Sequence, residues 1–500
     1  MSPEPQSSSS IANKRRPAKT AIKHSSIYAA GNISRQLVGF LMLPIYTRFL
    51  SPEDYGVIGL LTLSISVIEI VLGVRLLQAI SKFYYEQDNL KDRNAVISGA
   101  FVLTGCASLI PALAFMLGST HISEFLFKTP EFGLIVAIFS IQMISHAIEN
   151  YALFYIRVQE RPWLYISVSF AKLLVQLSLN IFFVVWLELG ILGIAYSAGI
   201  SAVVFSLSLG FYTLSRTGIR VKWPLLKAML IFSWPLWLTG LAALYVSSSN
   251  IYFIGLFASI AHVGLYQLAA KFGSITSTLV WQPFSQYWQT ERFKIYHEGA
   301  DNHAYNDIFQ IIATLLIIAS TAVSLLAQPV IKLMASPEFH PAISAVPYLV
   351  FANLFASLTV FFNFSLLVKE RTQWIAKLQY AMAGIVTILF LLLIPSMGFQ
   401  GAALAMAMAE LLRLTITCII SRRFYDMHLK VGRIALLVIT AGGVSFFALQ
   451  PMISELAMFE NILIVTAATI IFSLFAVCYQ LTNSRHRTFI FSLIKSKKKA

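Results

Sequence analysis

Long runs of apolar residues recur along the whole chain and are separated by short polar segments. A helix that crosses the hydrocarbon core of a bilayer needs about 20 apolar residues, and each of these runs is long enough to span a membrane. The pattern therefore predicts an all-α polytopic membrane protein with about 14 transmembrane helices. The predicted spans are approximately residues 25–47, 57–80, 94–118, 132–156, 163–187, 189–213, 225–248, 262–286, 308–331, 342–367, 373–394, 399–420, 431–450 and 460–481.

The composition agrees with a membrane protein. Of the 500 residues, 57% are hydrophobic and 12% are charged, and the mean hydropathy is +0.74. Such a chain has too few polar side chains to cover its apolar surface in water, so lipid is expected to be part of its solvent. The net charge of +15 would point to nucleic acid in a soluble protein, but its distribution indicates another cause.

The basic residues are concentrated in alternate loops. When the loops are numbered alternately, 29 of the 37 Lys and Arg residues fall on one side, and only Arg48, Lys128 and Lys332 fall on the other. Basic loops of membrane proteins stay in the cytoplasm, so both termini are predicted to be cytoplasmic. The positive charge is thus a topology signal, with contact to anionic membrane lipids as a secondary effect, and no nucleic-acid partner is expected.

An internal repeat organises the chain. Residues 49–56 align with residues 257–264 at a shift of 208, and residues 158–161 match residues 368–371 at a shift of 210. At the shift of 208, Gly190, Gly193 and Ala195 also fall on Gly398, Gly401 and Ala403. These matches predict two lobes of six helices each, in the same orientation and related by a pseudo-two-fold axis along the membrane normal, plus two C-terminal helices.

The repeat predicts the domain boundaries. Residues 1–23 are rich in Ser, Pro and basic residues without an apolar core, which is typical of a disordered cytoplasmic tail and not of a signal peptide. The predicted domains are this tail, an N-lobe (24–213), a cytoplasmic linker (214–224), a C-lobe (225–423), two extra helices (430–481) and a basic cytoplasmic tail (482–500).

One segment of each lobe resembles a known family. Residues 46–56, Tyr-Thr-Arg-Phe-Leu-Ser-Pro-Glu-Asp-Tyr-Gly, resemble the signature that follows the first helix in polysaccharide-biosynthesis flippases of the Wzx type. Residues 263–271, Val-Gly-Leu-Tyr-Gln-Leu-Ala-Ala-Lys, resemble its counterpart in the second lobe. The resemblance implies the superfamily fold shared with MATE multidrug exporters and the lipid II flippase MurJ.

The resemblance also implies a function. Proteins of this family translocate undecaprenyl-diphosphate-linked oligosaccharide across the bacterial cytoplasmic membrane for O-antigen, capsule or exopolysaccharide synthesis, with a polysaccharide polymerase and a chain-length regulator as expected partners. One position departs from the family. Many relatives carry an acidic residue near the end of the seventh span, where this chain has Asn250. Cation coupling through that position is therefore in doubt.

Charged residues well inside the spans mark the candidate site. A charge at the centre of a transmembrane helix costs about 2.5–3.5 kcal/mol on insertion scales, so it normally faces a water-filled cavity or a partner. Five cations outnumber three acids, which suits an anionic ligand. The charged residues are Arg35, Arg75, Lys172, Lys271 and Arg413, with Glu69, Glu149 and Glu410.

Helical spacing adds neutral polar residues to this set. Polar side chains recur on the face of the first span that carries Arg35 and on the face of the eighth span that carries Lys271. The predicted substrate-binding residues are Arg35, Lys271, Lys172, Arg75, Asn32, Gln36, Gln267 and Ser274. For the neutral residues, hydrogen bonding between helices is the alternative role.

The three acidic residues inside the predicted spans are expected to have two different roles. Glu410 and Arg413 are spaced i, i+3, which predicts a structural ion pair. Glu69 and Glu149 are candidates for a proton relay, and pairing with the interior cations is the alternative.

The sequence lacks the motifs of an enzyme. It has no Walker-type loop and no His/Cys metal spacing, and its three cysteines, Cys106, Cys418 and Cys478, lie in predicted spans. No catalytic residue, cofactor or metal is therefore predicted. Two alternatives to a flippase stay open: a MATE-like secondary multidrug exporter, and a membrane-embedded glycan polymerase or ligase.

Overall fold

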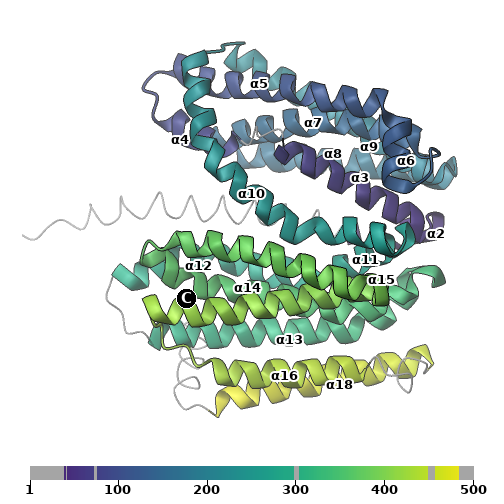
Figure 1. Ribbon diagram of the computed structural model, residues 1–500, viewed down its shortest axis with the longest axis vertical. Coiled ribbons are helices and arrows are strands. Elements are labelled where there is room, and N and C mark those ends of the chain that lie inside the picture. Colours follow the sequence, from purple (N-terminus) through teal and green to yellow (C-terminus); the bar gives the residue numbers. More distant parts are fainter. Residues whose placement is uncertain (1–38, 41, 72–75, 298–302, 449–456, 483–500) are drawn as a thin grey trace, which may run out of the picture. The chain divides into compact units, whose positions relative to one another are not determined.

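The computed structural model describes residues 39–40, 42–71, 76–297, 303–448 and 457–482 (Figure 1). Over these residues the chain is almost entirely helical and contains no strand, which confirms the all-α prediction. Within this part, nine helices are long and apolar enough to cross a membrane. The total of 14 spans stays a prediction, because most of the first one lies outside the described residues.

The described residues form the following helices. In the first half of the chain they are α2 (Leu43–Phe49), α3 (Pro52–Val71), α4 (Leu77–Tyr85), α5 (Leu90–Leu117), α6 (Ser119–Phe127), α7 (Gly133–Val158), α8 (Pro162–Asn180), the π-helical η1 (Ile181–Trp186), α9 (Gly190–Thr217) and α10 (Trp223–Phe257). In the second half they are α11 (Ile260–Gly273), the π-helical η2 (Ser277–Trp281), α12 (Gln282–His297), α13 (His303–Met334), the 3₁₀-helical η3 (Pro337–Ala345), α14 (Val346–Val368), α15 (Thr372–Phe424), α16 (Val431–Phe447) and α18 (Met458–Leu481).

Residue contacts divide the chain into two compact units. The first unit contains Ser64–Leu238, and the second contains Tyr46–Leu63 together with the described residues from Thr239 onwards. The division falls within α3 and within α10, so the start of α3 belongs with the second half of the chain. The lobe boundaries expected from the sequence stay predictions.

Each unit has its own core. In the first unit α7 packs against α5, α8 and α9, and in the second unit α14 packs against α11, α13 and α15 (Figure 1). In the second unit large aromatic side chains, among them Trp288, Phe309 and Phe361, fill the core. Aromatic rings bury a large apolar area on a few rotatable bonds, which suits a tightly packed bundle.

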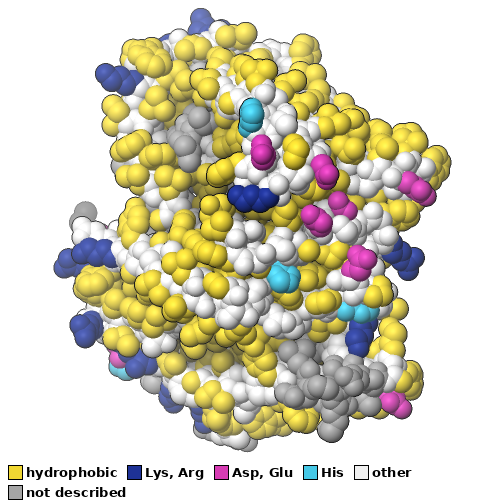
Figure 2. All heavy atoms as spheres, turned by 45° about the vertical axis from the view of Figure 1, so that its right-hand side comes forward, with side chains coloured by type: hydrophobic (Ala, Val, Ile, Leu, Met, Phe, Trp, Pro, Cys, Tyr) yellow, Lys and Arg dark blue, Asp and Glu magenta, His cyan; other side chains and the backbone are white. Residues whose placement is uncertain are grey.

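The helices differ in how far the rest of the protein covers them. In the most apolar window of Pro337–Val368, 78% of the residues are buried, compared with 11% in Pro162–Trp186. The first segment is therefore a core helix, whereas α8 exposes apolar side chains such as Phe170 and Leu174. Apolar side chains also dominate the face shown in Figure 2. A surface of this kind is stable in contact with lipid tails and not with water.

The two copies of the sequence repeat have matching backbone conformations. Glu160 and Glu370, which align at the shift of 210, both have a φ of +54°. Gly190 and Gly398, which align at the shift of 208, have φ values of +53° and +57°. Residues other than glycine rarely adopt positive φ, so its recurrence at aligned positions indicates that the two copies share their local structure.

Gly398 separates two predicted spans that follow each other within α15. Its φ of +57° and ψ of −134° break the helix between residues 373–394 and 399–420. Only glycine adopts this combination readily, because any side chain would be strained there. Three residues further on, Gly401 lies close to the preceding span: a Cβ there would be 2.2 Å from the carbonyl oxygen of Leu393. The two glycines thus allow a sharp reversal of the chain.

Replacing Gly398 by alanine is expected to lower stability by about 1–3 kcal/mol, the usual cost of a strained backbone. Gly384 of the same helix is the matched control, because no atom lies within 4 Å of a Cβ added there. Gly384→Ala is expected to be neutral or to stabilise by up to about 1 kcal/mol, since alanine favours a helix interior. Apparent melting temperatures of the purified variants in detergent measure both effects, and equal values for the two variants would contradict the role of Gly398.

Candidate ligand-binding site

Four of the predicted substrate-binding residues lie outside the described part of the chain. They are Arg35, Asn32 and Gln36 of the first predicted span, and Arg75 of the second. Their proposed contacts with substrate stay predictions. The site described below is built from the eighth predicted span, which contains Lys271, and from the segment of the second unit that begins at Tyr46.

The two motifs that align in the repeat each begin a helix with a serine cap. At the start of α3, the Ser51 hydroxyl accepts from the backbone N–H of Asp54 at 3.1 Å, and the Asp54 carboxylate accepts from the backbone N–H of Ser51 at 2.9 Å. At the start of α11, the Ser259 hydroxyl accepts from the backbone N–H of His262 at 3.2 Å. Such caps satisfy orphan donors and fix where a helix starts.

Past these caps, α3 and α11 cross at two glycines that are equivalent in the repeat. A Cβ at Gly56 would be 1.9 Å from the carbonyl oxygen of Ile260, and a Cβ at Gly264 would be 1.8 Å from that of Pro52. Pro52 and Ile260 are themselves equivalent at the shift of 208, so the contact is reciprocal, as in a two-fold interface. Both segments belong to the second unit. The glycines are therefore needed because the two backbones touch.

Lys271 lies on α11, two turns beyond Gly264. Its ammonium group donates to the Tyr55 hydroxyl at 3.1 Å and lies 4.9 Å from the centre of the same ring. Among the described residues, no carboxylate lies within 4 Å of it. The lysine is therefore held by a neutral side chain through a hydrogen bond and a cation–π contact, and its positive charge is not cancelled by an acid.

Tyr55 did not stand out as a site residue from the sequence. It is buried, and its ring meets Phe339 edge-on at 5.4 Å. Its position directly before Gly56 in the repeated motif was the available signal. That signal marks Tyr55 as part of a repeated local structure, but only the folded chain brings its hydroxyl to a lysine 216 residues away.

The neutral members of the predicted stripe on α11 have internal contacts. The amide nitrogen of Gln267 lies close to α3, where a Cβ at Gly59 would be 2.7 Å from it. The Ser274 hydroxyl donates to the carbonyl oxygen of Lys271 at 2.9 Å. These contacts favour a packing role over direct ligand contact for both residues, and their substrate-binding role stays a prediction.

Asn250, where the family resemblance implied an acidic residue, has hydrogen bonds on both atoms of its side-chain amide. Its side-chain amide donates to the Tyr266 hydroxyl at 2.7 Å, and both residues are buried. The amide oxygen of Asn250 accepts from the backbone N–H of Ile251 at 2.7 Å. A neutral amide that is satisfied in this way carries no charge for a cation to bind.

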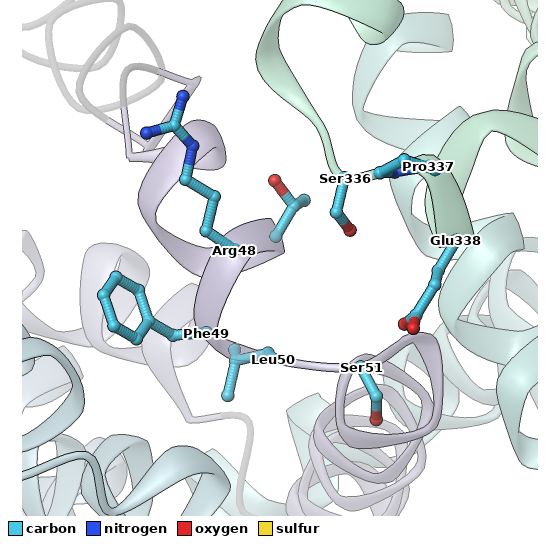
Figure 3. A pocket seen from close by; sticks show the side chains of 8 residues that line it. Arg48, Phe49, Leu50, Ser51, Ser336, Pro337 and Glu338 are labelled. Carbon is cyan, nitrogen blue, oxygen red and sulfur yellow. The ribbon is translucent and has the colours of Figure 1, made fainter.

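A small pocket with a mixed polar and apolar lining lies between the Thr47–Ser51 segment and the Ser336–Glu338 segment (Figure 3). Its volume is about 410 Å³. Figure 3 shows the Ser336 hydroxyl directed into the space between the segments and the Glu338 side chain extending towards Ser51. Both segments lie in loops predicted to be external, since they follow the first and ninth spans.

Four other charged residues of the described spans form two ion pairs. In the first unit the Lys172 ammonium forms an ion pair with Glu149, whose side chain is 8% exposed. In the second unit Arg413 and Glu410 lie 2.6 Å apart, as their i, i+3 spacing predicts. Lys172 is thus neutralised, which distinguishes it from Lys271, and its role in substrate binding stays a prediction.

Solved structures show where this fold occurs. The lipid II flippase MurJ in an inward closed conformation matches 94% of this chain and 100% of its own, with a TM-score of 0.72 and 13% identity. An inward-facing MATE multidrug resistance transporter matches 79% of this chain and 97% of its own (TM-score 0.58, 14% identity). A MOP superfamily transporter from Pyrococcus furiosus, described as having a binding pocket of reversed polarity, matches 81% of this chain and 95% of its own (TM-score 0.50, 15% identity).

These likenesses define the class: a multi-pass membrane protein with the fold of MurJ and the MATE transporters. Residues 45–344, more than half of the chain, match the model of a protein family whose description is 'polysaccharide biosynthesis protein'. The chain therefore belongs to this family, which confirms the resemblance found in its two motifs. No curated protein sequence matches the chain significantly.

Proposed function

We propose that this protein is a flippase that translocates undecaprenyl-diphosphate-linked oligosaccharide across the bacterial cytoplasmic membrane. The observation that carries the proposal is the state of Lys271, whose ammonium group is held by Tyr55 and has no carboxylate within 4 Å in the described part of the chain. A cation within a span without an acidic partner is costly unless an anion binds to it. A diphosphate supplies that anion.

The chemistry of a diphosphate fits such a site. Ammonium and guanidinium groups form short, charge-assisted hydrogen bonds with phosphate oxygens. A lysine acts as a point charge whose three donors can turn towards any oxygen, and an arginine adds a planar fork. In this proposal Lys271 binds one phosphate, and Arg35 and Arg75 contribute further positive charge.

The remaining parts of the substrate need different environments. The glycan is polar and cannot cross hydrocarbon unaided, so hydroxyl and amide groups within the protein would replace its water. The lipid tail is apolar and would stay in the bilayer during translocation. Alternating access of the substrate site to the two sides of the membrane, by rocking of two lobes, would then move the head group without moving the tail out of lipid.

Two findings support the proposal. The chain belongs to a family of polysaccharide biosynthesis proteins. MurJ, which matches this chain over its own whole length, is a flippase of lipid II. The MATE transporters share the fold as well, so the fold by itself does not separate a lipid-linked substrate from a small cation. The uncompensated charge of Lys271 favours the anion.

The orientation in the membrane follows from the basic loops. Both termini are proposed to be cytoplasmic, because 29 of the 37 basic residues lie on that side. Reporter fusions after Asn89 and Arg216 should be active in the cytoplasm, and fusions after Thr129 and Ser336 should be active outside. If the fusions after Asn89 and Thr129 report the same side, the orientation is wrong.

Deletion of the gene in its own host tests the function. A flippase defect should leave lipid-linked repeat units on the cytoplasmic face of the membrane, where externally added glycan-modifying reagents cannot reach them. Loss of a polymerase would instead leave single units on the external face. Loss of a drug exporter would leave lipid-linked units unchanged and raise the retention of cationic dyes. Either of the last two patterns would overturn the proposal.

A further inference from the structure

The pocket at the start of α3 is built from two segments that are far apart in the sequence. One wall is the Thr47–Ser51 segment, and the other is the Ser336–Glu338 segment at the start of η3 (Figure 3). Both belong to the second unit. The volume of about 410 Å³ is within the range of small-ligand sites. We call this cavity the external pocket, because both segments lie in loops predicted to be external.

Contacts between the two walls fix the shape of the external pocket. The hydroxyl of Thr47 donates to the carbonyl oxygen of Met334, just before the second wall, at 3.3 Å. The ring of Tyr55 meets the ring of Phe339, just after the second wall, edge-on at 5.4 Å. Thr47, Tyr55 and Phe339 are all buried. The pocket is therefore bounded by packed parts of the second unit.

Three polar side chains of the external pocket are available to a ligand. The hydroxyl oxygen of Ser336 is buried, has no hydrogen-bond partner among the described residues and is directed into the pocket (Figure 3). Arg48 and Glu338 are exposed, and neither has an ion-pair partner within 4 Å in the described part of the chain. The pocket thus offers a guanidinium donor, a carboxylate acceptor and a hydroxyl that can do either.

The repeated fold does not require the charge at one edge of this pocket. At the shift of 208, Ser51 falls on Ser259, and each of these serines caps a helix. At the same shift, Arg48 falls on Leu256. The cap is thus present in both copies of the repeat, whereas the arginine is present in one. A charged loop residue that the shared fold does not need is a candidate for ligand contact.

The lining of the external pocket matches the chemistry of a sugar. Phe49, Leu50 and Pro337 add apolar surface beside the polar side chains. A sugar has hydroxyl groups that donate and accept hydrogen bonds, and C–H groups on its faces that pack against apolar side chains. An anion would be repelled by Glu338, and a cation would be repelled by Arg48. The lining therefore favours a neutral ligand with several hydroxyl groups.

The external pocket is a neighbour of the Lys271 site. Ser51 of the pocket and Tyr55, which holds Lys271, are four residues apart, so about 6 Å of helix separates them. Tyr55 also contacts Phe339, which directly follows Glu338 of the opposite wall. The two sites are therefore close enough to bind one ligand that carries both a phosphate group and a sugar.

We propose that the external pocket binds a sugar unit of the lipid-linked oligosaccharide while Lys271 binds its diphosphate. The inference rests on the proposed function and adds a second subsite to it. The Glu338 carboxylate accepts from sugar hydroxyls, and Arg48 and Ser336 donate to sugar oxygens. Because the pocket lies on the predicted external side, it holds the glycan after the head group has crossed the membrane.

Binding of two lipids that differ in their sugars tests the proposal. The probes are the lipid-linked oligosaccharide extracted from the host and undecaprenyl diphosphate, which has no sugar, each titrated into purified protein in detergent. Glu338→Gln should bind the first lipid roughly 10-fold more weakly than wild type, and Ser336→Ala roughly 2- to 5-fold more weakly, because hydrogen bonds to the sugar are lost. Both variants should bind undecaprenyl diphosphate as wild type does. Glu131→Gln is the matched control, because Glu131 is exposed and lies outside the pocket, and it should bind both lipids normally.

Two results of this titration overturn the proposal. One is an unchanged affinity of Glu338→Gln and Ser336→Ala for the lipid-linked oligosaccharide. The other is an equal loss of affinity for both lipids, because such a loss would not come from the sugar. Lys271→Gln should weaken the binding of both lipids. If it weakens neither, Lys271 does not bind the diphosphate, and the Glu338 and Ser336 variants still decide whether the pocket binds sugar.

If wild type binds neither lipid, the proposed function fails, and protection from labelling decides the role of the pocket. In a variant whose three native cysteines are replaced by alanine, Pro337→Cys places a thiol in the pocket lining and keeps its polar side chains. Host oligosaccharide freed from its lipid by mild acid should slow the reaction of this thiol with a membrane-impermeant maleimide several-fold. The reaction of Glu131→Cys should be unaffected. Equal rates at Pro337→Cys with and without oligosaccharide overturn the proposal.

Discussion

Replacement of Lys271 by glutamine is expected to reduce translocation of lipid-linked oligosaccharide by roughly 10- to 100-fold per folded protein. Glutamine keeps polarity and approximate size but removes the charge, and hydrogen bonds to charged groups contribute about 1.5–3 kcal/mol. Lys332→Gln is the matched control, because Lys332 is an exposed lysine at the end of α13. Flipped oligosaccharide per folded transporter in proteoliposomes is the measurement.

Two milder variants separate charge from position at the same site. Lys271→Arg should keep part of the activity, since the positive charge is retained. Tyr55→Phe keeps the ring under the ammonium group and removes only the hydrogen bond of 3.1 Å, so a loss of a few fold is expected. If Lys271→Gln translocates at the wild-type rate, Lys271 does not bind the diphosphate. If its activity falls only in proportion to protein level, the lysine has a structural role.

Alanine at Gly56 or Gly264 is expected to destabilise the fold, by about 1–3 kcal/mol or more for each substitution. The added Cβ would lie 1.9 Å from the Ile260 oxygen in the first case and 1.8 Å from the Pro52 oxygen in the second. These obstacles are backbone atoms and cannot rotate away, so α3 and α11 must move apart. Apparent melting temperatures in detergent measure the loss. Gly442→Ala is the control, since no atom lies within 4 Å of its added Cβ.

The double substitution tests whether the contact is reciprocal. If one separation of α3 from α11 accommodates both methyl groups, Gly56→Ala combined with Gly264→Ala should cost less than the sum of the two single effects. Two unrelated sites would give additive losses. Additivity within about 0.5 kcal/mol, or a single variant as stable as wild type, would contradict the described contact.

The sequence was sufficient for the fold class, because the length of an apolar run is a local property. A bilayer requires about 20 apolar residues per helix, and the spacing of such runs shows the spans without knowledge of their packing. The internal repeat could also be read from local features of the sequence. Ser51 and Ser259 each cap a helix, and Gly190 and Gly398 both have positive φ, because identical residues at aligned positions favour the same backbone conformation. The ion pair of Glu410 and Arg413 was predictable for the same reason, because their i, i+3 spacing places them on one face of a helix.

Contacts between distant segments could not be derived in this way. Helical phase places a charge on a face but does not say which side chain lies opposite. The sequence assigned both Lys172 and Lys271 to substrate binding, yet one forms an ion pair with Glu149 and the other is held by Tyr55. Likewise, the aligned glycines at 56 and 264 indicated a shared local structure and not that the two copies touch each other.

The difference between what the sequence predicts and what it does not predict follows from the range over which each interaction acts along the chain. Hydrophobicity, helix capping and glycine conformation act within a few residues, so the sequence by itself determined a membrane-embedded helical chain with an internal repeat and a cationic set of span residues. The neutralisation of each charge depends on groups that are close in space and distant along the chain. Only the tertiary structure decided which of the two span lysines, Lys172 and Lys271, has no acid beside it among the described residues, because the folded chain brings Tyr55 to Lys271 and Glu149 to Lys172.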